Sequence, residues 1–200
     1  MSRSVSDENA ERKRAQRREL RGLRAGLTAR QRRQKSARAT RHFLHGEQFM
    51  VPRVVALYWP MGEELDCRDI ISGLVARGQE VVLPRIEGEK RPLRFLRFEG
   101  EKELVKGPFG TVQPRSDAAE FLPDLVILPL LGFDGAGRRL GYGGGYYDRS
   151  LAWLDGMAQY AVGRYGLGFD VQRQERIVAG PHDQPLDGVV TESGILRFRG

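Results

Sequence analysis

The stretch from Arg138 to Arg149, which reads RRLGYGGGYYDR, places four glycines within five positions. It lies between an apolar run, 125–131, and an amphipathic segment, 146–154, so we expect the chain to leave a strand, turn and enter a helix here. Glycines in such a turn expose backbone N–H groups with no Cβ to obstruct a ligand. The positive end of the following helix dipole points at the same place. The segment therefore predicts an anion site suited to a nucleotide phosphate.

The turn matches neither of two common nucleotide-binding patterns. A Walker A motif ends in Gly-Lys-Ser/Thr, which does not follow these glycines. A dinucleotide fingerprint that starts at Gly141 would need its third glycine where Tyr146 stands. Taken alone, the glycine cluster is equally typical of a plain tight turn, or of an α/β enzyme that holds the phosphate of a phosphosugar there.

Basic charge is concentrated at the N-terminus. Residues 1–50 contain 14 Lys and Arg against five Asp and Glu, a net charge of +9, whereas the whole chain carries +7 and residues 51–200 therefore carry −2. Such a segment is typical of a module that binds RNA or DNA, or of a helix that lends one or two cations to a phosphate site. Aromatic residues are not interleaved with the basic ones, which favours the second alternative and no nucleic-acid partner.

Length and composition narrow the class of protein. Two hundred residues suit a single domain, and no apolar run approaches the roughly 20 residues that cross a bilayer, so we expect no membrane partner. The polar, basic N-terminus does not resemble a secretory signal. Cys67 is the sole cysteine, which excludes an intrachain disulfide and favours a structural role for this thiol. We expect a cytoplasmic monomer.

The first quarter of the chain predicts helices. Residues 1–8 are expected to form a disordered tail, and 9–200 a single α/β domain on which a basic helical segment, 9–45, is packed. Gly26 and the residues after it interrupt that segment, and Thr28 is a suitable N-cap for a second helix.

Further along, apolar runs separated by Pro and Gly predict the strands of a sheet. Asp66 is expected to cap a helix over 67–76 that Gly78 ends, and this helix joins two strands into a parallel βαβ unit. Residues 100–123 are rich in Gly and Pro and predict an irregular excursion. The expected strands cover residues 53–59, 81–83 (ended by Pro84), 93–98, 125–128 and 159–164, with a final hairpin of 188–191 and 195–198.

This order of elements predicts an α/β fold. We expect three layers, with a mostly parallel, Rossmann-like sheet, helices on both faces and an N-terminal helical segment. Ligands of such folds bind beyond the carboxyl ends of the strands. The loop 59–64 and the glycine turn both follow strands, so we expect them to face one cleft.

Several segments, in the same order along the chain, resemble the signature of the 5-formyltetrahydrofolate cyclo-ligases (5,10-methenyltetrahydrofolate synthetases). The glycine-rich string is the most specific of them, and the resemblance extends from about residue 11 to residue 192. The other matching segments are the basic stretch 13–17, the loop 58–66, the strand 82–85, the approach to the glycine turn at 128–134, and the C-terminal pieces 182–183, 186–187 and 190–192.

The resemblance implies an ATP-dependent ring closure with Mg²⁺. In this family, 5-formyltetrahydrofolate and MgATP become 5,10-methenyltetrahydrofolate, ADP and phosphate. The γ-phosphoryl group moves to the formyl oxygen, N10 attacks, and phosphate leaves. Positioning and charge neutralisation dominate phosphoryl transfer, so a nucleophile motif is not needed.

The resemblance also implies roles for residues of the phosphate site. Lys13 and Arg17, four residues apart on one helix face, would neutralise ATP phosphates, while the remaining arginines of this segment are interpreted as solvated or as contacts for the glutamate tail of the folate. Lys13, Arg17 and Tyr147 would be the catalytic residues. Besides Lys13 and Arg17, the nucleotide would be held by Arg139, Leu140, Gly141, Tyr142, Gly143, Gly144, Gly145, Tyr146 and Tyr147.

Four acidic or aromatic positions complete the expected site. Asp148 and Asp183 would bind Mg²⁺; the alternatives are a helix-dipole aspartate and a turn residue, respectively. Glu64 would accept a pair of hydrogen bonds from the pterin ring of the folate. The expected substrate contacts are Trp59, Glu64, Tyr142 and Tyr147, for whose aromatic members core packing is an equally good interpretation.

Overall fold

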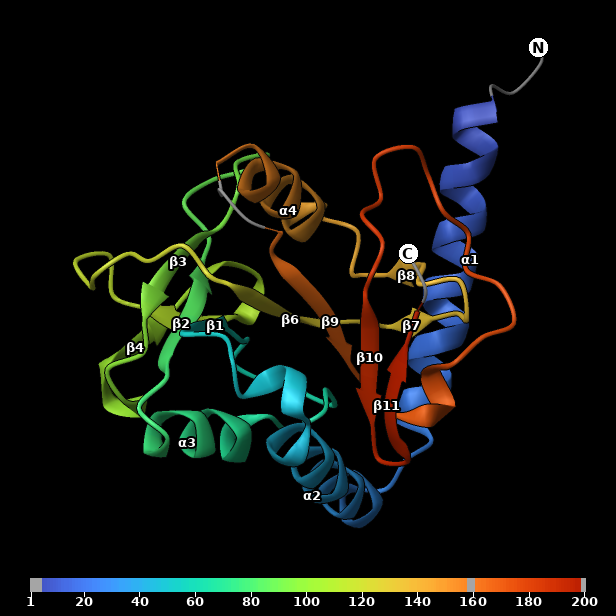
Figure 1. The fold of residues 1–200 in the computed structure, drawn as a ribbon. Coiled ribbons are helices and arrows are strands. Elements are labelled where there is room, and N and C mark those ends of the chain that lie inside the picture. The colour runs from blue at the N-terminus through green and yellow to red at the C-terminus, as the bar shows by residue number, and fades with distance from the viewer. Residues whose placement is uncertain (1–4, 158–160, 199–200) are drawn as a thin grey trace.

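The computed structural model describes residues 5–157 and 161–198 (Figure 1). Its main sheet has seven strands in the order β11-β10-β9-β6-β1-β2-β3. The five inner strands are mutually parallel, and each edge strand is antiparallel to its neighbour, which confirms the predicted mostly parallel α/β sheet. The strands are β1 (Val54–Ala56), β2 (Glu80–Arg85), β3 (Arg94–Arg97), β6 (Leu125–Pro129), β9 (Gly163–Leu167), β10 (Gly188–Thr191) and β11 (Gly194–Arg197).

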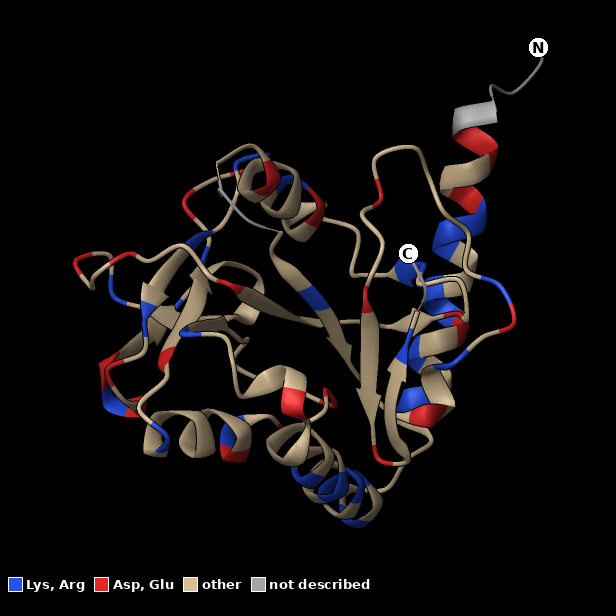
Figure 2. Cartoon of the chain, viewed as in Figure 1, with Lys and Arg blue, Asp and Glu red and all other residues tan. Residues whose placement is uncertain are grey.

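Helices cover both faces of this sheet (Figure 1). The helices α2 (Ala29–His45) and α3 (Arg68–Ala76) pack on one face, and α4 (Tyr146–Met157) packs on the other. The first helix, α1 (Val5–Ala25), lies against segments that follow β6 and β9. Lys and Arg residues gather along α1 and α2, where the sequence concentrates its positive charge (Figure 2).

Alternate residues of the inner strands enter two separate cores. Val55 and Ile127 are fully buried beneath α2 and α3, whereas Ala56, Val126 and Leu128 are fully buried beneath α4. Because successive side chains of a strand point to opposite faces, a strand covered on both sides must be apolar throughout. This arrangement explains the uninterrupted apolar runs.

The predicted break between the first two helices is confirmed. The Thr28 hydroxyl accepts a hydrogen bond from the Gln31 N–H at 3.2 Å, and the Gln31 side chain accepts one from the Thr28 N–H at 2.8 Å, which forms a capping box. The prediction of a disordered tail is wrong for residues 5–8, because α1 begins at Val5. Asp7 and Glu8 lie in its first turn, where negative charge favours a helix. Residues 1–4 lie outside the described residues.

Several predicted boundaries shift. The strand β1 ends at Ala56 because the chain then leaves the sheet toward the cleft, and β2 runs through Pro84 to Arg85. Pro84 is tolerated because its missing N–H would face the side on which β1 has already ended. The helix α3 begins one residue later than predicted, and the prediction of Asp66 as its N-cap is wrong, because Cys67 occupies that position. The Asp66 carboxylate still accepts the Arg68 N–H, at 3.1 Å, from the residue before the cap.

The excursion at 100–123 contains regular structure that the sequence did not predict. It forms a small antiparallel hairpin of β4 (Leu104–Lys106) and β5 (Val112–Pro114). A second hairpin, β7 (Gly132–Phe133) with β8 (Arg139–Leu140), separates β6 from the glycine turn. The strand β9 starts at Gly163, whereas the predicted start at 159 falls outside the described residues. Single turns of 3-10 helix occur at η1 (Glu47–Phe49), η2 (Glu101–Glu103), η3 (Pro108–Gly110) and η4 (Asp170–Gln172).

Within residues 5–157 and 161–198, none of the helices combines the length and apolar character that crossing a bilayer requires.

Candidate active site

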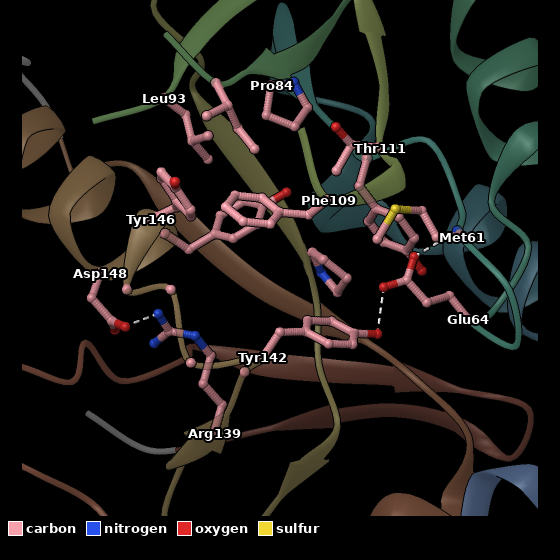
Figure 3. Close-up of a pocket in the computed structure, with 18 of the residues that line it drawn as sticks. Met61, Glu64, Pro84, Leu93, Phe109, Thr111, Arg139, Tyr142, Tyr146 and Asp148 are labelled. Carbon is pink, nitrogen blue, oxygen red and sulfur yellow. Dashed lines mark hydrogen bonds and ion pairs between the residues drawn. The ribbon is translucent and has the colours of Figure 1, made fainter. Parts of the chain in front are cut away.

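The candidate site lies where the connections of the sheet diverge. From β1 the chain crosses through α3 to β2, and from β6 it crosses through α4 to β9 on the other side of β1. Ligands of doubly wound sheets bind at the carboxyl ends of strands beside such a switch point. A cleft of about 550 Å³ opens there, lined by the loop after β1, the glycine turn, α1 and the β4–β5 hairpin (Figure 3).

Every residue that the sequence predicts for the site lines this cleft. They come from four separate parts of the chain, and the structure brings them together. The residues are Lys13, Arg17, Trp59, Glu64, Arg139, Leu140, Gly141, Tyr142, Gly143, Gly144, Gly145, Tyr146, Tyr147, Asp148 and Asp183. We refer to the part built by α1, the turn 141–145, Arg139 and the two aspartates as the glycine-turn end, and to the part around Glu64, Trp59 and Met61 as the Glu64 end.

At the glycine-turn end, the backbone is shaped for close approach. Gly143 and Gly145 have φ of +105° and +66°, a region that side chains with a Cβ rarely adopt. The N–H groups of residues 143–145 donate to no protein acceptor within the described part of the chain. The helix α4 begins directly after them at Tyr146, so its positive dipole end faces the same space. The geometry of this turn therefore fits the predicted anion cradle.

Two cations from α1 border this cradle. The Arg17 Nε donates to the Gly141 carbonyl at 2.9 Å, which places the guanidinium against the turn. Burial lowers the pKa of Arg17, with the charge of Arg21 acting in the same direction. Lys13 Nζ forms an ion pair with Asp183 at 2.5 Å. A negative ligand beside Arg17 would offset its repulsion by Arg21.

Both predicted metal ligands are engaged by cations. Asp148 pairs with the buried Arg139 at 2.5 Å (Figure 3) and accepts the Gln184 N–H at 3.0 Å, while Asp183 pairs with Lys13. Among the described residues, no group of three or more His, Cys, Asp or Glu side chains could hold a metal alone. Magnesium needs no such cage, because it is commonly bound by one or two carboxylates plus phosphate oxygens.

Among the described residues that line the Glu64 end, Glu64 is the only one with a carboxylate. Glu64 is 8% exposed, and its Oε2 accepts the Met61 N–H at 2.8 Å. Its Oε1 accepts a short hydrogen bond from the Tyr142 hydroxyl (Figure 3). Burial raises the pKa of Glu64, while these two hydrogen bonds and the charge of Arg24 act to lower it. Trp59 stacks on Phe98 with ring centroids 5.8 Å apart and forms part of the wall.

The aromatic side chains of the turn extend between the two ends. Tyr142 reaches from the glycine turn to Glu64, so a ligand that spans the cleft would pass over its ring (Figure 3). Tyr147 also lines the cleft, and burial raises the pKa of both hydroxyls so that they stay protonated at neutral pH. Cys67 lies beneath this end, where its thiol donates to the Tyr58 carbonyl at 3.1 Å and burial raises its pKa, in agreement with a structural role.

The sequence analysis did not predict the wall of the cleft that the β4–β5 hairpin forms. Phe109, at the tip of the β4–β5 hairpin, is 72% exposed and its ring centroid lies 6.3 Å from that of Tyr146. Its φ of +58° is unusual for a bulky residue. An aromatic residue between Gly107 and Gly110 was the available signal. Further lining residues outside the prediction are Pro84, Ile86, Leu93, Thr111, Val112 and Gln113.

Fold and site together define a class: α/β proteins with a glycine turn and helix N-terminus at the switch point of a mostly parallel sheet. The chain belongs to the 5-formyltetrahydrofolate cyclo-ligase family, whose model matches residues 9–192. It is 31% identical to the 5-formyltetrahydrofolate cyclo-ligase of Haemophilus influenzae, over 89% of this chain and 96% of that one. It is also 31% identical to the Escherichia coli enzyme of the same name, over 90% of this chain and all of that one.

Solved structures agree with this assignment. The NMR structure of Aquifex aeolicus 5,10-methenyltetrahydrofolate synthetase superposes with a TM-score of 0.79 at 28% identity, covering 94% of this chain and 93% of that one. The Mycoplasma pneumoniae 5,10-methenyltetrahydrofolate synthetase, at 20% identity, shares the fold with a TM-score of 0.72, covering 90% of this chain and 98% of that one. The predicted family is thereby confirmed.

Proposed function

We propose that this protein converts 5-formyltetrahydrofolate to 5,10-methenyltetrahydrofolate in an ATP- and Mg²⁺-dependent reaction that releases ADP and phosphate. The observation that carries the proposal is the cleft itself, in a chain of this family. An anion cradle with two cations occupies one end and a buried carboxylate the other, and about 550 Å³ lies between and around them. A triphosphate and a pterin have the chemistry that these two ends would recognise.

The glycine-turn end would bind the triphosphate. Its free N–H groups at 143–145 and at the start of α4 would donate hydrogen bonds to phosphate oxygens, and Lys13 and Arg17 would add positive charge. Phosphate oxygens would compete with Asp183 for Lys13 and with Asp148 for Arg139, because these ion pairs lie in the cleft wall. Exchange of partners would leave both carboxylates available to a cation.

Asp148 and Asp183 are the residues that would hold Mg²⁺. Their carboxylate oxygens are the hard ligands that this ion prefers, and their places in the wall of the same cleft fit an ion shared with a triphosphate. When bound, Mg²⁺ neutralises charge that develops on the phosphoryl group during transfer.

The chain's remaining task is to orient the folate. Glu64 would accept hydrogen bonds from the pterin ring, and Trp59, Tyr142 and Tyr147 would flank it. The formyl oxygen would then face the glycine-turn end and receive the γ-phosphoryl group from ATP, with ADP as leaving group. N10 attacks the formyl carbon and loses its proton, the carbon–oxygen bond breaks, and phosphate departs. Tyr147 lines the space between the ends, where we place it beside the reacting atoms.

A spectroscopic assay tests this function. Purified protein supplied with 5-formyltetrahydrofolate and MgATP should produce the absorbance of the methenyl product, with one phosphate released per ring closed. Omission of ATP or chelation of Mg²⁺ should abolish the signal. Folded protein that forms no methenyl product under these conditions would refute the proposal. A cytoplasmic location and a monomeric state stay predictions, and sedimentation of the purified chain measures the second.

A further inference from the structure

One stripe of α1 carries more than the two cations that the sequence assigns to the site. The stripe consists of Lys13, Arg17, Leu20 and Arg24, whose spacing of four, three and four residues puts them on one face of the helix. Lys13 and Arg17 contact the glycine-turn end, and Leu20 is fully buried. The sequence interpretation left Arg24 among the arginines that are solvated or that bind the glutamate tail of the folate.

Arg24 is buried and not solvated. Its residue is 7% exposed, its Nη1 donates to the Tyr142 hydroxyl at 2.7 Å, and its guanidinium carbon lies 5.7 Å from the centre of the Tyr142 ring. Its buried Nε has no hydrogen-bond partner in the part of the chain that the structure describes. A buried guanidinium is costly unless its charge is compensated, so its location requires an explanation.

The Glu64 carboxylate compensates the charge of Arg24 through the Tyr142 hydroxyl, which lies between them. The Tyr142 hydroxyl accepts from Arg24 and donates to Glu64 Oε1, which forms a continuous chain from cation to carboxylate. The other carboxylate oxygen accepts the Met61 N–H. A carboxylate has about four acceptor positions, so these bonds fix its orientation and leave about two positions for a ligand in the cleft. Hydrogen bonds in such a chain reinforce one another.

We propose that Arg24 is a positioning residue, which through the Tyr142 hydroxyl holds the Glu64 carboxylate in the orientation that receives the folate ring. The inference rests on the proposed function. Arg24 is not among the residues that line the cleft, so it acts through Tyr142 and not by contact with the substrate. The same helix thus serves both ends of the cleft, with Lys13 and Arg17 at one and Arg24 at the other.

The charges around Glu64 give this role a distinct pH signature. The charge of Glu64 acts on four nearby groups, and burial raises the pKa of each, so they are neutral at and below neutral pH; they are Tyr58, Tyr142, Tyr147 and Cys67. Arg24 supplies a positive charge that lowers the pKa of Glu64 against the effect of burial. Removal of the Arg24 charge should therefore raise the pKa of Glu64. The fall in folate affinity at acid pH should then begin at a higher pH than in wild type.

The test compares Arg24→Met with Arg24→Lys and with Arg18→Met. Arg18 is exposed on the same helix and matches the loss of charge without touching the cleft. We expect Arg24→Met to raise the KM and the Kd for 5-formyltetrahydrofolate about 10-fold or more, with the KM for ATP within about twofold of wild type. Relative to Arg24→Met, Arg24→Lys should regain part of the folate affinity, and its pH dependence of folate affinity should match wild type because lysine keeps the positive charge. Arg18→Met should match wild type throughout.

Each outcome has a defined meaning. Unchanged MgATP affinity in Arg24→Met shows that the variant is folded, so a loss confined to the folate supports positioning. Unchanged folate affinity and an unchanged pH dependence of that affinity, with or without a lower melting temperature, would overturn the inference and leave Arg24 a packing residue. The inference would also be overturned if each of the two variants, Arg24→Met and Arg24→Lys, lost as much affinity for ATP as for the folate. A wild-type protein that neither binds nor converts the folate would instead refute the proposed function.

Discussion

The two ends of the cleft would bind their ligands by opposite means. The glycine-turn end would spread recognition over backbone N–H groups, a helix terminus and several cations, some of which are paired with aspartates. The Glu64 end would concentrate recognition in the carboxylate of Glu64, which is 8% exposed. When many donors share a ligand, removal of one donor costs only part of the affinity. When one buried charged group holds the ligand, its removal costs most of the affinity. Substitution of Glu64 itself should therefore have a larger effect than substitution of any single group at the glycine-turn end.

The difference also reflects the ligands that each end would receive. A triphosphate is flexible and highly charged, so backbone donors and several cations suit it. A pterin is rigid and presents neighbouring donors, so one fixed carboxylate suits it, provided that the protein holds that carboxylate still. The chain Arg24–Tyr142–Glu64 supplies this fixation.

The largest effect should come from Glu64→Gln. The amide keeps the size of the side chain, but its NH₂ group cannot accept, and it would oppose the donors of Tyr142, Met61 or the folate. We expect kcat/KM for 5-formyltetrahydrofolate to fall about 100-fold, with the KM for ATP little changed. Steady-state rates of methenyl formation with each substrate varied in turn measure this.

The adjacent residue provides the control. Glu63 carries the same charge on the same loop, but its side chain is 39% exposed and lies 4.0 Å from Arg32. Glu63→Gln should behave as wild type. If the two variants lose activity equally, the loss stems from the loop and not from recognition by Glu64.

Arg17→Met should have the next largest effect, at the glycine-turn end. It removes one cation of several, so we expect the KM for ATP to rise about 10-fold while the folate Kd stays at the wild-type value. Nucleotide binding should also become less sensitive to salt, because fewer charges are neutralised. Titration calorimetry with ATP and with the folate at two ionic strengths separates these effects. A loss of folate affinity as large as that of ATP affinity would contradict the division of the cleft into two ends.

Asp148→Asn should have a smaller effect that depends on conditions. The amide oxygen can still ligate Mg²⁺, but the negative charge is lost and the Arg139 guanidinium loses its ionic partner. We expect about tenfold more Mg²⁺ to be needed for half-maximal rate, with nearly normal turnover when Mg²⁺ is saturating. Asp117→Asn, an exposed aspartate paired with Arg115 elsewhere, is the matched control. An unchanged Mg²⁺ requirement would leave Asp148 with the helix-dipole alternative.

The glycine-turn end was predictable because its information is local. Five consecutive residues set the backbone path, and the required positive φ at Gly143 and Gly145 explains why glycines stand there. The inner strands were predictable for the same reason, since burial on both faces imposes apolar runs. Their ends were not, because β1 stops where the chain turns toward the cleft and β2 continues only beside β3.

The Glu64 end depends on contacts that no local pattern encodes. Glu64 itself could be assigned only through the resemblance to a family. Phe109 reaches the cleft because a hairpin of two short strands places it there, and such strands have too few residues to show a period of two. Arg24 looked like one more arginine in a basic helix, yet its spacing from Lys13, Arg17 and Leu20 already placed it on the buried stripe.

The smallest effect on activity should come from Cys67→Ala, which tests whether the Glu64 end is preformed. Cys67 is fully buried beneath that end, and its raised pKa keeps it a thiol, so it can neither serve as a nucleophile nor react with reagents while the protein is folded. We expect kcat and both KM values to be unchanged and stability to fall by about 1 kcal/mol. In the wild type, a thiol reagent should label Cys67 only as fast as the protein unfolds. Rapid labelling of folded protein that slows when the folate is added would show that this end opens and closes around its ligand, and the inference that the Glu64 carboxylate is held in place before the folate binds would then fail.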